Sequence, residues 1–180
     1  GNELDSLSAG TLAIGGNLTQ SLGATGDTYH TSGTHQTIFS GNNPTISFGT
    51  PGDVPGTSHF QSFAWTGTGT LTLGSDVFAH VSFTTASTSA VTISSAAGRL
   101  LQVGNIASAG PVTFNNVRLG LNQPTGGPLA LSNATFSGLV NTAIQLTVNH
   151  PGTGGPFSFN NLTFNVTPTG AGRYLSATDA

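Results

Sequence analysis

Short runs of alternating apolar and polar residues fill the chain, and glycine, proline, asparagine or aspartate separates them every few residues. Alternation with a period of two is typical of half-buried β-strands, and the separating residues favour tight turns. The only helical candidate is the short stretch 94–101. Strands are predicted over 11–18, 35–39, 45–48, 60–65, 68–73, 77–83, 90–93, 100–106, 112–119, 129–136, 143–148 and 157–166.

A sequence repeat organises the second half of the chain. Phenylalanine opens three similar tetrapeptides: Phe114-Asn115-Asn116-Val117, Phe136-Ser137-Gly138-Leu139 and Phe159-Asn160-Asn161-Leu162. Their nearly constant spacing matches one coil of a parallel β-helix, which holds two or three short strands with their turns. Successive coils stack about 4.8 Å apart. We therefore expect Phe114, Phe136 and Phe159 to stack inside as one column, with the asparagines at a strand end or corner, bonded along the axis.

The repeat and the strand pattern together predict an all-β fold, a parallel β-helix of about eight coils of roughly 22 residues each. Residues 1–180 form a single domain in this interpretation, which we expect to be a segment of a larger protein. An antiparallel β-sandwich or jelly roll produces the same short strands and turn residues and stays open as the alternative fold.

Composition narrows the class of protein. Glycine, serine, threonine and asparagine supply 87 of the 180 residues, while only nine residues are charged and none is lysine. The low charge argues against nucleic-acid binding because phosphate contacts need basic residues, and no apolar run is long enough to span a membrane. The absence of cysteine excludes disulfides and thiolate metal sites. We expect an extracellular or cell-surface location.

The order of short motifs resembles the repetitive β-helical segments of very large bacterial surface proteins, of the adhesin and autotransporter-passenger kind. The resemblance covers about residues 10–83, with an echo at 156–166, and rests on the stretches 12–20, 33–41, 44–48, 58–63 and 69–77. It implies a right-handed β-helix with a structural or adhesive role and no cofactor. The Ala/Ser-rich stretch 86–98 departs from the pattern, so an interruption of the stacking is expected there.

Few residues are candidates for chemistry. Asp53 and Asp76 are one coil apart and Asp27 lies slightly more than one coil before Asp53, so the three could form a column. Turn capping is the favoured role for them, ahead of calcium binding or glycoside hydrolysis. His30 and His35 lie an odd number of positions apart and would face opposite sides of a strand, which disfavours a shared metal site. The sequence therefore predicts no enzyme, with no catalytic, cofactor-binding or metal-binding residues.

The leading functional hypothesis is a structural or adhesive extracellular module, with a self-assembling filament or surface-fibre subunit as one version. Its partners would be copies of itself or neighbouring repeats. The alternative is a carbohydrate-binding or polysaccharide-active β-helix that recognises surface glycans through a groove containing Trp65 or Tyr29. Ice binding is a third hypothesis. It requires regular Thr-x-Thr ladders at the coil period, and 68–72 is the only clear local run.

Overall fold

The protein is a parallel β-solenoid. Its structure, a computed structural model, describes residues 7–21, 28–123, 128–139, 144–150, 156–165 and 175–179. Within these residues every strand pairing is parallel, and the solenoid has about six turns of roughly 24 residues. The predicted fold is confirmed and the sandwich alternative is wrong. The coils are fewer and longer than the sequence predicts, and the right-handed winding stays a prediction.

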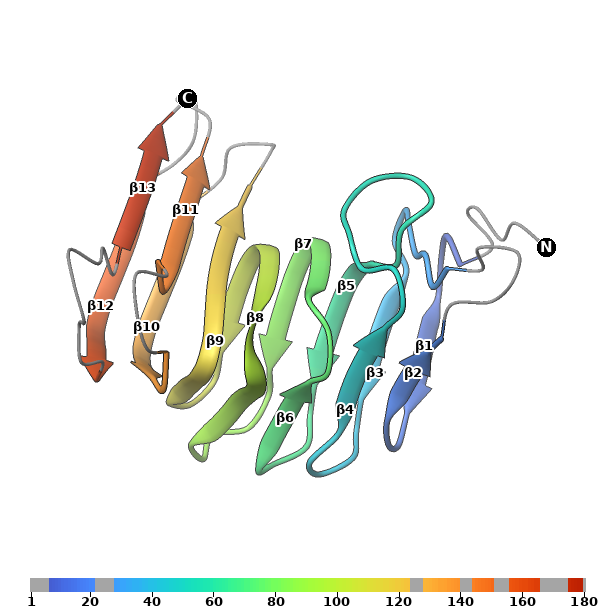
Figure 1. Ribbon diagram of the computed structural model, residues 1–180, viewed down its shortest axis with the longest axis horizontal. Helices are drawn as coiled ribbons and strands as arrows, with labels where there is room; N and C mark the ends of the chain where they lie inside the picture. The colour runs from blue at the N-terminus through green and yellow to red at the C-terminus, as the bar shows by residue number, and fades with distance from the viewer. Residues whose placement is uncertain are drawn as a thin grey trace.

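The strands lie side by side along one axis, with β1 and β2 at one end and β12 and β13 at the other (Figure 1). In the described residues they are β1 (Thr11–Ile14), β2 (Leu18–Gln20), β3 (Gln36–Phe39), β4 (Thr45–Phe48), β5 (Phe60–Trp65), β6 (Thr70–Leu73), β7 (Val77–Thr85), β8 (Val91–Ser108), β9 (Val112–Asn122), β10 (Leu129–Ser137), β11 (Leu146–His150), β12 (Phe157–Asn165) and β13 (Leu175–Asp179).

Each coil contributes segments to three ladders of parallel strands. The first ladder runs from β1 through β3 and β5 to the ends of β7 and β8. The second runs from β2 through β4 and β6 to parts of β8, β9, β10 and β12. The third joins the remaining parts of β7, β8 and β9 to β11 and β13. The long strands belong to more than one ladder because they bend at corners, and β8 contributes to all three.

The core consists of side chains stacked coil upon coil. In the second ladder one inward column contains Leu71, Ile93, Phe114, Phe136 and Phe164. The rings of Phe114 and Phe136 lie 5.1 Å apart and nearly parallel, and those of Phe136 and Phe164 lie 5.0 Å apart. Parallel in-register strands place like side chains over one another, so each coil buries its apolar face against the next.

The predicted phenylalanine column is correct for Phe114 and Phe136 and wrong for Phe159. Phe136 pairs with Phe164, while Phe159 pairs with Leu131 in another part of β10. The motif that repeats in space is a threonine followed by an apolar residue that enters the core, rather than the Phe-Asn-Asn tetrapeptide. The coil from β10 to β12 is longer than the coil from β9 to β10, which shifts the sequence echo out of register.

Asparagines at the corners join neighbouring coils, as the sequence predicts. The Asn161 amide Nδ2 donates to Asn133 Oδ1 at 2.8 Å, and the Thr70 amide nitrogen donates to Asn43 Oδ1 at 2.8 Å. Asn43, Asn133 and Asn161 have φ values of 56°, 53° and 55°. Asparagine tolerates this left-handed conformation better than most residues, which lets the chain turn sharply between ladders.

Most predicted strands are present, with three differences. The helical candidate 94–101 is wrong because these residues lie within β8, where Ser94 pairs with Asn115 and Arg99 with Val117. In the stretch 86–98, where an interruption is expected, residues 86–90 form the connection between β7 and β8, and the pairing of β8 shifts register between Ser94 and Arg99. The strand predicted over 11–18 divides into β1 and β2, and β13 has no counterpart among the predicted strands.

Candidate functional site

A stiff loop between β4 and β5 extends from the row of strands (Figure 1). At its base Pro51 and Ser58 form a parallel bridge, and the Gly52 amide donates to the Ser58 carbonyl at 3.2 Å. At its tip the Thr57 hydroxyl donates to the Val54 carbonyl at 2.6 Å. These internal bonds hold the loop in one shape, so the residue between them, Asp53, is presented to the neighbouring coils in a fixed position.

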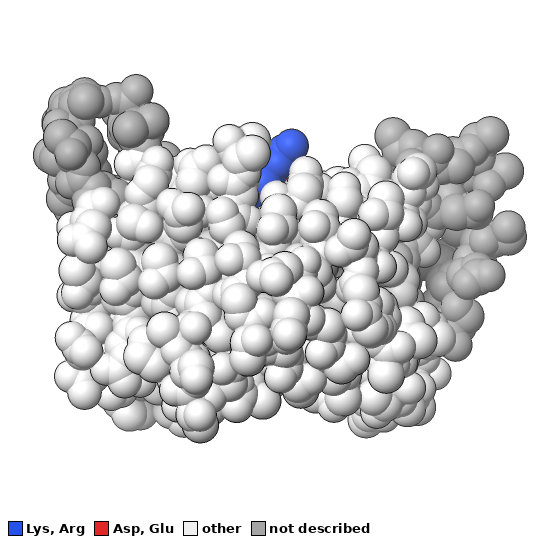
Figure 2. Space-filling view, turned by 90° about the horizontal axis from the view of Figure 1, so that it is seen from below, with Lys and Arg blue, Asp and Glu red and all other residues white. Residues whose placement is uncertain are grey.

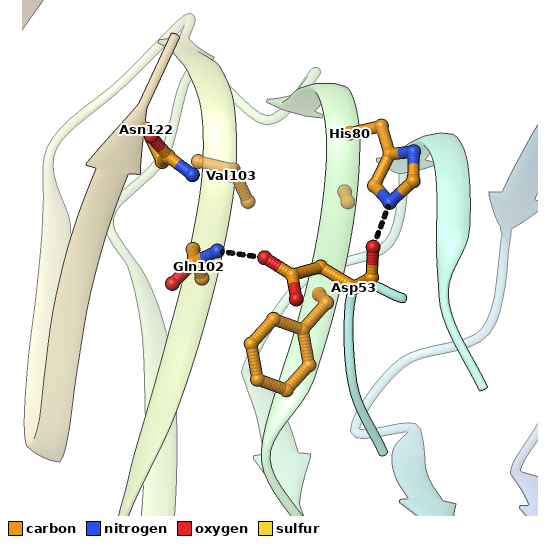
Figure 3. Close-up of a pocket in the computed structure, with 7 residues that line it drawn as sticks. Asp53, His80, Gln102, Val103 and Asn122 are labelled. Carbon is orange, nitrogen blue, oxygen red and sulfur yellow. Dashed lines mark hydrogen bonds between the residues drawn. The ribbon is translucent and has the colours of Figure 1, made fainter. Parts of the chain in front are cut away.

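The loop and the outer surface of the third ladder enclose a pocket of about 250 Å³. Figure 3 shows Asp53 between Gln102 and His80. Gln102 Nε2 donates to Asp53 Oδ2 at 2.9 Å, and His80 Nε2, as the protonated ring nitrogen, donates to the Asp53 carbonyl at 3.1 Å. The lining residues are Asp53, Phe78, Ala79, His80, Gln102, Val103 and Asn122.

Register explains why these residues meet. Phe78 pairs with Gln102, and Gln102 pairs with Gly120, so the three occupy one outward column on successive coils. The glycine at the third position has no side chain, and Gln102 lies against it: a Cβ on Gly120 would be 3.4 Å from Gln102 Cγ. Asn122 follows two residues later on the same face, and its Oδ1 accepts a 3.1 Å bond from Asn149 Nδ2. This bond orients the amide so that its nitrogen faces Val103 in Figure 3.

A stack of imidazole rings lies beneath the loop. The rings of His30 and His59 are 4.3 Å apart and edge-on, and those of His59 and His80 are 4.3 Å apart and nearly parallel. Burial lowers the pKa of the His59 imidazole to about 4, and the positive charges that His80 and His30 acquire on protonation contribute to this lowering. Neither ring nitrogen of His59 makes a hydrogen bond of good geometry within the described residues.

Asp53 and Asp76, the two acidic residues of the expected column that the structure describes, have different roles. Asp53 lines the pocket, whereas Asp76 Oδ1 accepts a hydrogen bond from the Leu100 amide at 2.9 Å and braces one coil against the next. This bond joins two coils and is not the local turn capping expected for Asp76 from the sequence. Among the described residues no group of three histidine, cysteine or acidic side chains is arranged to hold a metal ion. Asp27 lies outside the described residues.

The candidate sugar-binding aromatics belong to the interior. Trp65 is fully buried and its Nε1 donates to the Gly41 carbonyl at 3.0 Å, so a groove built on it is wrong. Tyr29 is half-buried, stacks on Phe48 at 5.8 Å and shares a 2.7 Å hydrogen bond with Thr37. Phe63 is buried too.

The two histidines considered from the sequence lie in different surroundings. His30 belongs to the imidazole stack, whereas His35 Nδ1 contacts the Ala9 carbonyl at 3.3 Å.

Sequence reasoning missed Phe78, Gln102 and Asn122 as site residues. These side chains face outward at related positions of successive coils. Sequence alone cannot align those positions until the lengths of the corners are known.

Charge is sparse on the surface. Figure 2 shows one face of the described solenoid with a small area of arginine and no acidic side chain in view. Arg118 is held by its Nε, which donates to the Gly98 carbonyl at 3.1 Å.

No family model, curated protein or solved structure matches the chain. In the part of the chain that the structure describes, there is no helix of the length and hydropathy needed to cross a membrane. The fold and the geometry of the surface are thus the basis for assigning a function.

Proposed function

We propose that the chain is a structural or adhesive module of an extracellular or cell-surface protein, and that it stacks end to end with copies of itself or with neighbouring repeats. The observation that carries this proposal is that the strands at both ends of the solenoid have an unpaired outer edge in the described residues. Within the described residues β1 and β2 pair with other strands on one side only, and so do β12 and β13. The outer edge at each end can accept a further coil.

The core columns run into these ends without a polar cap in the described residues. Leu146 is fully buried, but its partner one coil on, Leu175, is 43% exposed. Leu129 is likewise buried and its partner Phe157 is 41% exposed. Repeat proteins need terminal caps with a polar outer face for solubility. An uncapped end of a β-solenoid therefore favours continuation or self-association, because open edges pair with other strands.

Composition supports the location and the absence of catalysis in this proposal. The low charge, the threonine and asparagine content and the lack of cysteine suit the bacterial surface proteins that the motifs resemble. The chain then acts as a spacer or fibre element rather than as an enzyme, and nucleic acid is not among its partners.

Assembly can be tested by light scattering and negative-stain microscopy over a range of concentrations. We expect rods that lengthen with concentration. Phe157→Lys puts a charge on the exposed end and should reduce assembly at least tenfold. Val81→Lys is the matched control, because Val81 is 49% exposed on the side of the solenoid and the change should leave assembly unchanged. Monomers at every concentration, or equal effects of the two variants, would contradict the proposal.

A second function, ice binding, is favoured by one surface. The outer side of the second ladder repeats a Thr-apolar-polar tripeptide in five successive coils, in register. The tripeptides form what we call the threonine face: Thr70-Leu71-Thr72, Thr92-Ile93-Ser94, Thr113-Phe114-Asn115, Thr135-Phe136-Ser137 and Thr163-Phe164-Asn165. The coils repeat about every 4.8 Å, and alternate residues of a strand about every 6.6 Å. A flat, uncharged array of hydroxyl and methyl groups at such intervals can order water.

The threonine face extends the regular arrangement that the sequence alone showed only at 68–72. Ice binding is tested by thermal hysteresis and by inhibition of ice recrystallisation. Thr113→Lys, in the middle of the face, should abolish both effects. Thr84→Lys is the control: Thr84 lies on the first ladder, so this change should abolish neither effect. Absence of thermal hysteresis in the unaltered protein would rule out this second function.

A further inference from the structure

We propose that the pocket beneath Asp53 binds a single neutral sugar ring, through the Asp53 carboxylate and the Gln102 and Asn122 amides, with the apolar side chain of Phe78 beside it. This inference goes beyond the scaffold role and does not depend on end-to-end assembly. It gives the adhesive version of the proposed function a ligand class and a location.

The polar groups offer both kinds of hydrogen bond that sugar hydroxyls need. An ionised carboxylate has about four acceptor positions, and the bond from Gln102 uses one of them on Asp53. The Asn122 Oδ1 is already engaged by Asn149, so the donors of its Nδ2 face the pocket. Asp53 thus accepts from hydroxyls, while the two amides donate to them.

The apolar surface of the pocket comes from Phe78. Phe78 lies one coil before Gln102 in the same outward column, whereas the side chains of Ala79 and Val103, which also border the pocket, belong to the core. The C–H face of a sugar ring is apolar and packs well on such a surface while its hydroxyls reach the rim. Ligand sites commonly combine apolar walls with a few placed polar groups.

Charge and size restrict the ligand. None of the described residues that line the pocket is lysine or arginine, and the Asp53 carboxylate repels anions. With no three-ligand metal group in the described part of the chain, a metal-bridged anion is disfavoured as well. The volume of about 250 Å³ lies below the usual range for drug-sized ligands, about 300–1,000 Å³. A neutral monosaccharide unit, free or at the end of a glycan, suits these limits.

The polar groups of the pocket are held in place by hydrogen bonds, which favours ligand binding. Asp53 is held through its carbonyl by the bond from His80 of β7 and through its carboxylate by the bond from Gln102 of β8, which is 49 residues away in sequence. The entropy lost by ordering the site on binding is lower when the polar groups are already placed.

The test is saturation-transfer NMR followed by titration, with the whole chain and a panel of methyl glycosides of glucose, galactose, mannose and fucose. Sialic acid and glucuronic acid form the anionic arm. We expect saturable binding of at least one neutral glycoside, weakened about tenfold by Asp53→Asn and by Gln102→Ala. Gln36→Ala is the matched control, since Gln36 is a part-exposed amide on the first ladder.

Circular dichroism of each variant checks that the β-solenoid is intact. No binding by any neutral glycoside would overturn the inference, and so would binding that survives both Asp53→Asn and Gln102→Ala. Stronger binding of the anionic sugars would overturn it too, because the carboxylate should repel them. These outcomes leave the assembly experiment unaffected, so the two proposals can fail separately.

Discussion

The first and last coils of the solenoid reach the same stacking by different means. Between Tyr29 and Phe83 the aromatic rings meet at many angles: Phe39 and Phe60 lie edge-on at 85°, whereas Phe63 and Phe83 are stacked at 4.4 Å. In the later coils the rings of Phe114, Phe136 and Phe164 form one nearly parallel column. The early coils also carry the long loop and the histidine stack.

The lengths of the coils explain why the two regions look so different in sequence. Thr11 pairs with Gln36 near the start of the chain, and Val91 pairs with Val112 near its middle. Leu146 pairs with Leu175 close to the end. The middle coil is the shortest of these three and the last is the longest, because insertions at corners change the sequence period while the ladders keep their register. The fold thus requires alignment of the strands, and not a constant repeat length.

The largest expected effects come from truncating one buried phenylalanine side chain in each region. Phe136→Ala and Phe63→Ala remove fully buried rings, and each should lower the free energy of unfolding by about 3–5 kcal/mol. Phe136→Leu should cost less than Phe63→Leu, because the Phe136 column already holds Leu71 and Ile93 at equivalent positions. Urea unfolding measures all four. Equal costs for the two leucine variants would show that the regions pack alike.

The next prediction concerns the early coils, where the histidine stack makes stability depend on pH. The pKa of His59 is about 4 in the folded protein and ordinarily 6.5, so the unfolded chain takes up the proton first as the pH falls. The contribution of the neutral His59 side chain to the free energy of unfolding is therefore complete above pH 6.5. It is lost as the pH falls from 6.5 to about 4, and the loss is about 2 kcal/mol after allowance for solvent screening. His59→Leu should flatten the dependence over this interval. Unfolding curves at pH 7 and pH 4.5 measure it, and an unchanged pH dependence in the variant would contradict it.

An effect of similar size tests whether corner asparagines act alike in both regions. Asn133→Ala removes the bond to Asn161 and forces alanine into a left-handed conformation, so it should cost about 2 kcal/mol. Asn133→Gly relieves the backbone and should cost about half as much. The same two changes at Asn43 should give the same order. Thermal unfolding measures them, and an alanine variant as stable as the glycine variant would refute the conformational argument.

The smallest effect is expected on the threonine face. Thr135→Val keeps the shape of a side chain on the outer side of the second ladder, so stability should change by less than about 0.5 kcal/mol. Thermal unfolding measures the change. A loss near that of the asparagine variants would mean that the hydroxyl supports the fold and is not free for a ligand.

Particular residues show how far the sequence predicts this fold. Alternation and turn residues locate nearly all of the strands, and the interval from Phe114 to Phe136 correctly indicates stacking. The same interval places Phe159 in the wrong column, because the coil that leads to β12 is longer than the one before it. The site escapes prediction for the same reason. Asp53 meets Gln102 two coils away, a proximity that depends on the summed lengths of several corners.

The stiff loop that carries Asp53 has a consequence for how such a protein can change over time. It adds residues at a corner and leaves Ile46 paired with Leu73 and Ile38 with Ala64 on either side. Corners therefore accept insertions without disturbing their neighbours, and each corner offers a separate place for a new loop at steps of about 4.8 Å along the axis. Recombination or protein engineering could exchange recognition loops on this scaffold one at a time, with the stacked interior left as it is.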